Sequence, residues 1–464
     1  MISKKLAKKL LDESLKTGAD FAELYLEETQ SHLIQSDNDK IENIGSFFSR
    51  GIGVRLLKEN RSVYGYTNEI NEKKIMNLIH RLSLAFKGPQ IATCKDFVDK
   101  HIRRISKIQK SYFDTRNDEK IAILNKVSTA MKDYSPLVIR TLNAFSANKK
   151  KVEIYNSEGL HAKDNKERVI LILRAYASEN RKTEFGFNSI GSVEGMSRFD
   201  NVDFQKEAIQ AAQEAVSLLS AKECPSGKMT VIVSNGFGGV LFHEACGHSL
   251  EATAVARGLS VFSNRLGEQI ASPIVNAYDD ATLLHRWGTE NMDDEGNLTQ
   301  KNCLIKNGVL SGYLIDNFNG RRMHATGNGT CRRQNYKYEP TSRMNNTYID
   351  NGTSTVDEII KNTKLGLYAK HLGGGSVSPT TGEFEFACSV AYIVRDGKIA
   401  EQVRGATLIG TGEEVLKNID MIANDLDFDY GYCGSASGDV PVATGQPTIR
   451  IKEITVGGSG GKLE

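Results

Sequence analysis

The chain has 464 residues, of which 39% are hydrophobic and 25% are charged, and its formal net charge is +2 at pH 7. This composition is that of a folded globular protein long enough to form two or three hydrophobic cores. The nearly balanced charge argues against nucleic-acid binding, which needs a concentrated basic surface. No window approaches the roughly 20 apolar residues of a membrane span, so we expect no membrane segment.

The first half of the chain shows the same order of predicted elements twice. The first set is a helix at 6–17 ended by Gly18, strands at 21–28, 31–36, 50–58 and 61–67, and a helix at 71–86. The second set is a helix at 117–133, strands at 136–143, 151–156, 167–177 and 182–189, and a helix at 203–220. These assignments follow from the spacing of apolar residues. We interpret the repeat as a duplication of two α+β subdomains, residues 1–105 and 106–222, with chance similarity as the alternative.

The character of the sequence changes in the second half. From residue 223 onward short strands and glycines are frequent, and the predicted helices are few: 236–255, 355–364 and 412–419. The predicted fold class is therefore α+β, with a duplicated N-terminal α/β region followed by a β-rich third domain over residues 223–464.

One motif in this third domain indicates a chemistry. His243-Glu244-Ala245-Cys246-Gly247-His248 places two imidazoles on either side of a carboxylate, within the predicted helix at 236–255. Two neutral histidines suit zinc, and a glutamate beside the first can take a proton from a water that the metal activates. The same letters also occur by chance in proteins that bind no metal. A preceding glycine-rich loop, residues 234–239, favours the metal interpretation, because a helix that starts there presents free amides.

The two histidines are five residues apart, one more than in the HExxH pattern of zinc peptidases. A regular helix would separate their rings by roughly 140°. We therefore predict a π-type bulge or a break across residues 243–248, and we expect Gly247 to supply the unusual backbone angles.

The motif, the segment Gly431-Tyr432-Cys433-Gly434 and the stretch 440–448 together resemble the TldD/PmbA family of bacterial and archaeal metallopeptidases. Further matching stretches lie at 51–55, 327–329, 343–347 and 373–375, so the likeness extends over essentially the whole chain. The metal motif makes the chain similar to the TldD branch, because the TldE or PmbA branch lacks it. The resemblance implies that His243, His248 and Cys433 bind one Zn²⁺ per chain and that Glu244 is the general base. From the residues alone, Cys433 would be a buried small residue or an inert thiol.

The resemblance also implies a function. We expect a zinc-dependent peptidase that hydrolyses short or unfolded peptides bound in an extended form, in peptide maturation or clearance. The expected partners are a second copy, as a homodimer, or a TldE/PmbA-type paralogue, as a heterodimer. Two alternatives stay open: a metal-dependent hydrolase or amidase of a non-peptide substrate, and a non-catalytic scaffold with a structural metal. Four protein ligands would indicate the scaffold, whereas three with an open position would indicate catalysis.

The cysteines and the start of the chain indicate the compartment. The seven cysteines show no CxxC pairs, so we expect no disulfides, a reducing compartment and a cytoplasmic protein. The start of the chain is predicted to form an amphipathic helix rather than a signal peptide.

Four further polar residues are candidates for roles near the site. His324 is the preferred candidate for a residue that supports a metal ligand. Arg332, Arg333 and Arg343 could bind a peptide carboxylate, although surface ion pairs are the expected alternative.

Overall fold

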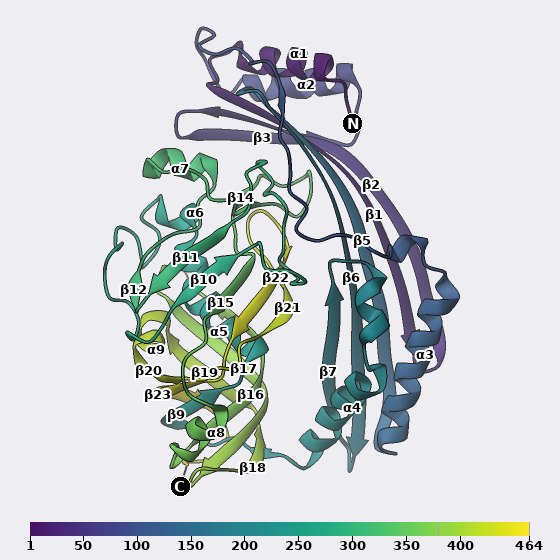
Figure 1. Cartoon of the computed structure of the whole chain (residues 1–464), viewed down its shortest axis with the longest axis vertical. Coiled ribbons are helices and arrows are strands. Elements are labelled where there is room, and N and C mark those ends of the chain that lie inside the picture. Colours follow the sequence, from purple (N-terminus) through teal and green to yellow (C-terminus); the bar gives the residue numbers. More distant parts are fainter. Residues whose placement is uncertain (379, 464) are drawn as a thin grey trace.

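The computed structural model describes residues 1–378 and 380–463, so positions 379 and 464 of the predicted third domain lie outside the described residues. Figure 1 shows two parts side by side: a long curved sheet from the first half of the chain and a β-rich body from the second half. The predicted α+β class is thus confirmed, whereas the boundaries at residues 105 and 222 stay a prediction. Within the described residues, no helix combines the length and the apolar character that crossing a bilayer requires.

The first half repeats one order of elements, a helix, three strands and a helix. The first set comprises α1 (Lys4–Leu15), β1 (Phe21–Asp37), β2 (Lys40–Lys58), β3 (Arg61–Thr67) and α2 (Glu72–Ser83). The short strand β4 (Val98–Asp99) leads to the second set: α3 (Asn117–Tyr134), β5 (Val138–Asn156), β6 (Leu160–Glu179), β7 (Lys182–Ser192) and α4 (Phe204–Ser220). Short 3-10 turns lie at Tyr112–Asp114 and Met196–Asn201. This repeated order supports the predicted duplication.

Both sets join in one seven-stranded sheet, ordered β3-β2-β1-β5-β6-β4, with β7 also paired to β6. The sequence separated 21–28 from 31–36 and 136–143 from 151–156, and this was wrong, because β1 and β5 are continuous and pair along their length. Their middle parts carry polar residues such as Gln30 and Lys151, which are exposed. These residues interrupt the apolar pattern, but the backbone hydrogen bonds of the ladder do not depend on it.

The two faces of this sheet have different partners. Leu24 of β1 packs in a core with α1 and α2, and Leu171 of β6 packs in a second core with α3 and α4. Tyr25, which points to the opposite face, packs with Met292 and Tyr336 of the C-terminal body. Because neighbouring residues of a strand alternate between faces, one strand serves both contacts.

The C-terminal body contains two main sheets. The six-stranded sheet has the order β12-β11-β10-β15-β22-β21. Its strands are β10 (Ala277–Asp280), β11 (Lys301–Lys306), β12 (Val309–Leu310), β15 (Asn346–Ile349), β21 (Asp427–Cys433) and β22 (Val440–Gln446). A two-stranded pair is formed by β13 (Cys331–Arg332) and β14 (Thr341–Ser342). The helices α7 (Asn317–Met323), α8 (Val356–Lys361) and α9 (Gly412–Asn418) surround the sheets.

The second, eight-stranded sheet closes on itself in part. Its strands are β8 (Lys222–Glu223), β9 (Gly227–Val233), β16 (Leu365–Val377), β17 (Glu383–Arg395), β18 (Lys398–Arg404), β19 (Ala406–Thr411), β20 (Ile419–Ile422) and β23 (Ile449–Gly457). The order runs β16-β9-β23-β19-β17-β18-β8, and β16 also pairs with β17. The strands β16, β9, β23, β19 and β17 therefore form a closed ring, which leaves no free edge among them.

The predicted helix at 236–255 is a series of short segments. They are a 3-10 turn at Gly236–Gly239, α5 (Val240–Phe242), a π turn at His243–Gly247, a 3-10 turn at His248–Leu250 and α6 (Ala252–Val255). The predicted π-type widening is confirmed, because the amide of His248 donates to the carbonyl of His243, five residues earlier.

The expected role of Gly247 was wrong. Its φ of −53° and ψ of −52° are ordinary helical angles. What its missing side chain allows is close packing, because a Cβ at this position would lie 2.2 Å from Sδ of the buried Met344. Gly412, at the start of α9, likewise allows this helix to pack closely against the turn, since a Cβ there would lie 1.9 Å from the carbonyl oxygen of Ala245.

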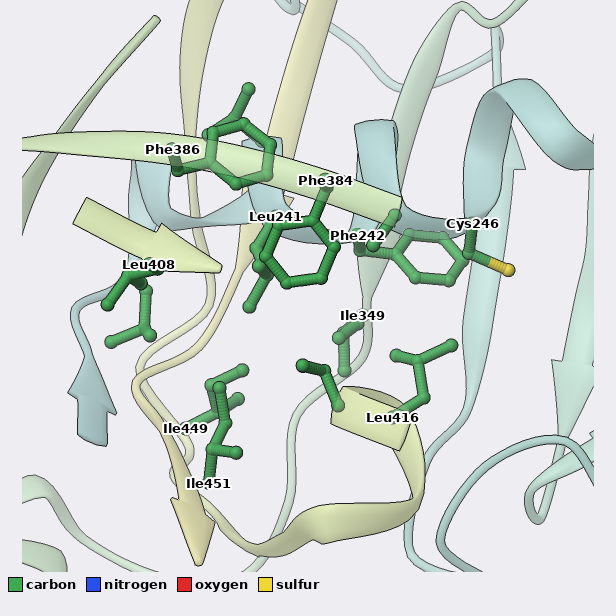
Figure 2. Packing of buried hydrophobic residues seen from close by; sticks show 14 of the residues in the cluster. Leu241, Phe242, Cys246, Ile349, Phe384, Phe386, Leu408, Leu416, Ile449 and Ile451 are labelled. Atoms are coloured by element: carbon green, nitrogen blue, oxygen red, sulfur yellow. The ribbon is translucent and has the colours of Figure 1, made fainter. Parts of the chain in front are cut away.

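The apolar side of this segment is anchored in a core that both sheets share. Leu241, Phe242 and Cys246 lie among Phe384 and Phe386 of β17, as Figure 2 shows. Burying each large apolar side chain stabilises the fold by about 1.5–3 kcal/mol. These anchors fix the side of the segment that faces away from the two histidines.

Buried ion pairs join the curved sheet to the C-terminal body. Arg55 Nη2 lies 3.0 Å from Glu23 Oε2 on the neighbouring strand and 2.6 Å from Glu295 Oε1 of the body. Arg333 Nη2 donates to the other oxygen of Glu23 at 2.8 Å. All four side chains are almost completely buried, so each charge depends on its partners rather than on water.

Replacing Arg55 by alanine should therefore destabilise the protein by about 3–5 kcal/mol, because Glu23 and Glu295 would lose their shared cation in the interior. The measurement is the midpoint of urea denaturation. Arg116→Ala is the matched control, since Arg116 pairs with Asp118 on the surface and its loss should leave the midpoint unchanged. Equal, small shifts for both variants would contradict this account.

Gly247→Ala should destabilise the protein by about 1–3 kcal/mol through overpacking against Met344. If the clash with Met344 alone causes this loss of stability, Gly247→Ala should cost nothing in a Met344→Ala background, where the side chain that clashes is absent. Denaturation midpoints of the two single variants and the double variant give this coupling. Additive costs would show that another contact of Gly247 is responsible.

Candidate metal centre

Three of the predicted site residues converge in the structure. The Sγ of Cys433 lies 3.2 Å from Nε2 of His243 and 3.2 Å from Nε2 of His248. The three donor atoms all lie within 4.8 Å of one another. His243 and Cys433 are buried, and the side chain of His248 is 13% exposed. The sulfur thus lies between two imidazole nitrogens, although 185 residues separate Cys433 from His248.

Two different elements bring these donors together. His243 begins the π turn and His248 follows its last residue, and the two rings lie 5.1 Å apart at an interplanar angle of 89°. Cys433 is the last residue of β21, where it pairs with Val440 of β22. The wide turn allows both rings to point toward the end of this strand, which a regular helix would prevent.

The donor set has the chemistry of a zinc site. Zinc binds thiolate at about 2.3 Å and imidazole at about 2.0 Å in tetrahedral geometry, which places sulfur and nitrogen about 3.5 Å apart. The two sulfur–nitrogen distances of 3.2 Å lie close to this value, so a small outward movement would admit an ion. Among the described residues, these three form the group of histidine, cysteine and acidic side chains that could hold a metal.

Glu244 lies at the edge of this cluster. Its Oε2 is 3.7 Å from Nε2 of His248, and its side chain is 20% exposed. The carboxylate is therefore close to the three donors and still reaches solvent. This is the position that a proton acceptor for a neighbouring water needs.

The three donors also shift one another's charge states. Burial raises the pKa of the Cys433 thiol, but the nearby His243 charge and hydrogen bonds from both histidines outweigh it and hold this pKa well below its usual value. Burial lowers the pKa of His248, but Glu251 and Cys433 outweigh it and hold that pKa well above its usual value. The thiolate, which is the metal-binding form of cysteine, is therefore the favoured form of Cys433.

Two residues lie next to the donors that the sequence analysis did not place there. Glu251 Oε1 lies 3.2 Å from Nδ1 of His248, on the side of the ring away from Cys433. Arg343, completely buried, donates from Nη2 to the carbonyl oxygen of Cys433. The position of Glu251 three residues after His248 was a signal that could have been used, since such pairs share a helix face. Arg343 was named in the sequence analysis as a possible contact for a peptide carboxylate, not as a neighbour of the donors.

Other expectations need correction. The surface ion pairs expected for Arg332, Arg333 and Arg343 were wrong, because all three side chains are buried. Arg332 Nη2 pairs with Glu290 at 3.1 Å in the interior. His324, the preferred supporting residue, is exposed at the end of α7, whereas Glu251 is the residue that contacts a donor histidine.

A polar cavity of about 400 Å³ lies between the curved sheet and the hairpin of β21 and β22. Tyr432, which precedes Cys433 in the chain, and Pro441 line it from the hairpin. The remaining lining is dominated by polar and charged side chains, among them Lys150, Arg168 and Glu290. Such a lining suits a polar ligand better than an apolar one.

Comparison with protein families places this site in a known context. Models of PmbA/TldA metallopeptidases match domain 1 at residues 22–85, the central domain at 111–219 and the C-terminal domain at 226–458. A Haemophilus influenzae protein named a metalloprotease TldD homologue is 36% identical, covering 95% of this chain and 93% of that protein. A Buchnera aphidicola protein of the same name is 31% identical, covering 97% of this chain and 95% of its own.

Solved structures share the fold. A Thermotoga maritima protein superposes with a TM-score of 0.81 at 20% identity, covering 98% of this chain and all of that one. TldE from Thermococcus kodakarensis superposes with a TM-score of 0.78 at 16% identity, covering 97% of this chain and 99% of its own. Because the family models cover all three parts and the named relatives match end to end, the chain belongs to the TldD/PmbA family of metallopeptidases, as a TldD-type member.

Proposed function

We propose that this chain is a zinc-dependent peptidase in which His243, His248 and Cys433 hold one zinc ion and Glu244 is the general base. The observation that carries the proposal is the position of the Cys433 sulfur, 3.2 Å from both imidazole nitrogens. A Saccharolobus solfataricus relative named a zinc metalloprotease TldD homologue, 28% identical over 56% of this chain and 58% of that protein, supports the choice of metal.

Zinc in this position would supply a Lewis acid that polarises a scissile carbonyl and makes a water easier to deprotonate. The rest of the chemistry falls to the side chains. Glu244 would accept the proton of the attacking water and return it to the leaving amine, for which its closeness to the donors and its contact with solvent are suited. His243 and His248 would each offer the metal the lone pair of Nε2.

The number of donors favours catalysis over a structural metal. Three protein side chains form the cluster among the described residues, and a tetrahedral ion held by three of them keeps one position for water or substrate. A fourth protein donor at bonding distance would have favoured the scaffold alternative.

Peptides are the substrate class that the comparisons favour. The relatives named metalloproteases agree with this choice over the amidase alternative. We further propose that the substrates are short or unfolded peptides bound in an extended form.

The partner and compartment are proposals of the same kind. The fold shared with TldE from Thermococcus kodakarensis supports pairing with a TldE/PmbA-type paralogue, with a homodimer as the second candidate. None of the seven cysteines forms a disulfide, in keeping with a reducing compartment and a cytoplasmic protein.

Glu244→Gln should lower peptidase turnover by about 10²–10⁴-fold while zinc content stays at one per chain, because the amide keeps the shape but cannot accept the proton. The measurements are cleavage of an unfolded peptide mixture and elemental analysis of the same preparation. Glu453→Gln, an exposed glutamate on β23, serves as the control and should keep full activity. Turnover at the original rate would remove Glu244 from the mechanism.

Cys433→Ser should lose most of its zinc, and its activity with it, because a neutral hydroxyl replaces the thiolate. Cys246→Ala is the matched control: Cys246 lies in the same motif, but it is a buried member of the apolar core rather than one of the three donors, so this variant should keep the metal. The measurement is zinc per chain after dialysis against a mild chelator. Equal zinc retention in the two variants would exclude Cys433 as a ligand.

A further inference from the structure

We propose that Glu251 and Arg343 form a buried bridge that positions two of the three zinc-binding side chains, His248 through its ring and Cys433 through its backbone. Neither residue touches the reacting atoms, so both are positioning residues. This inference rests on the proposed function. It extends the site beyond the motif at residues 243–248 to Arg343, the first residue of the segment 343–347.

The first end of the bridge holds the ring of His248. Glu251 Oε1 approaches Nδ1 at 3.2 Å, while Nε2 of the same ring faces the Cys433 sulfur at 3.2 Å. A carboxylate at Nδ1 keeps the proton on that nitrogen, which leaves the lone pair of Nε2 for a metal. Because Glu251 is 5% exposed, water competes little for the carboxylate.

His243 offers an internal contrast. Its Nδ1 is buried and has no hydrogen-bond partner among the described residues. The two donor histidines are therefore held differently: the ring of His243 by the packing of its buried surroundings, and the ring of His248 by the carboxylate of Glu251. His248 is also the more exposed of the two, so packing alone constrains its ring less.

The second end of the bridge holds the strand end that carries Cys433. The guanidinium of Arg343 donates from Nη2 to the carbonyl oxygen of Cys433 and from Nη1 to the carbonyl oxygen of Gly438 at 2.7 Å. Nη1 also donates to Oγ of Ser437 at 2.9 Å. One planar group thus fixes both sides of the turn between β21 and β22, which sets where the Cys433 sulfur lies.

The two ends meet inside the protein. Arg343 Nε lies 3.8 Å from Glu251 Oε1, and both side chains are buried. Neither atom has a hydrogen-bond partner among the described residues, so Oε1 acts on the guanidinium and on the ring of His248 through its charge. In a medium of low polarity this charge pair is strong, and losing either member would leave the other uncompensated. The bridge therefore links the histidine segment to the cysteine hairpin.

The test is metal binding rather than activity. Glu251→Gln removes the charge and keeps the shape, so its zinc affinity should fall by about 10–100-fold, measured by competition with a chromophoric chelator. Co²⁺ added to the zinc-free protein should give a visible spectrum with altered band positions and intensities, because the His248 ring is no longer held. Glu153→Gln is the matched control, since Glu153 is a buried carboxylate that contacts a histidine, His161, within the curved sheet, and should match the unmodified protein in both measurements.

Two further variants keep the proposal testable if Glu251→Gln does not fold. Glu251→Asp keeps the charge but shortens the reach, and Arg343→Lys keeps the charge but loses the planar fork. Both should bind zinc with an affinity between those of the unmodified protein and of a Cys433→Ser variant, with circular dichroism unchanged. Arg343→Lys should also alter the Co²⁺ spectrum, because the strand end that carries the sulfur is less constrained.

The outcomes separate this inference from the proposed function. Unchanged zinc affinity and Co²⁺ spectra in folded Glu251 and Arg343 variants, together with loss of zinc in His248→Ala and Cys433→Ser, would overturn the bridge and leave the zinc site standing. Unchanged zinc binding in His248→Ala and Cys433→Ser would instead overturn the site itself, and the bridge with it.

Discussion

The hydrogen bond from the amide of His248 to the carbonyl of His243 is the local constraint on which the site depends. It widens one helical turn, and the widening brings two rings that are five residues apart to the same side. π turns are rare because their backbone geometry is less favourable than that of an α-helix. Here the surrounding packing stabilises the turn: Phe242 and Cys246 are held in the apolar core, and Met344 fills the space beside Gly247.

A second constraint is the pairing of charges in the interior. Arg55, Glu23 and Arg333 meet between the curved sheet and the C-terminal body, and Glu251 and Arg343 meet beside the candidate metal centre. In both places a charge without its partner would be costly, because the surroundings provide little solvation. The arrangement of these groups is therefore tightly specified even where the net gain in stability is small.

One stretch of chain takes part in both networks. Arg333, just after β13, pairs with Glu23 of the curved sheet, whereas Arg343, just after β14, holds the Cys433 strand end. The small pair of β13 and β14 thus connects the concave face of the sheet to the hairpin that carries the sulfur. The polar cavity lies between the same two parts, so its walls and the cysteine donor share a common support.

The sequence by itself determined the features that depend on neighbours along the chain. The five-residue spacing of His243 and His248 required a widened turn, and apolar periodicity identified most helices and strands and the α+β class. Apolar periodicity did not predict the continuity of β1 and β5, because polar residues interrupt the pattern in the middle of each strand although the backbone hydrogen bonds continue. Only the family resemblance singled out Cys433.

The tertiary structure decided which distant residues meet. It placed the Cys433 sulfur between the two rings, buried Arg333 and Arg343 against carboxylates, and set Glu251 behind His248. Contacts of this kind depend on how β21, the π turn and the strands of the curved sheet pack in space. Local periodicity carries no information about such packing, because the energy of a buried charge or donor is set by its surroundings rather than by its position in the chain.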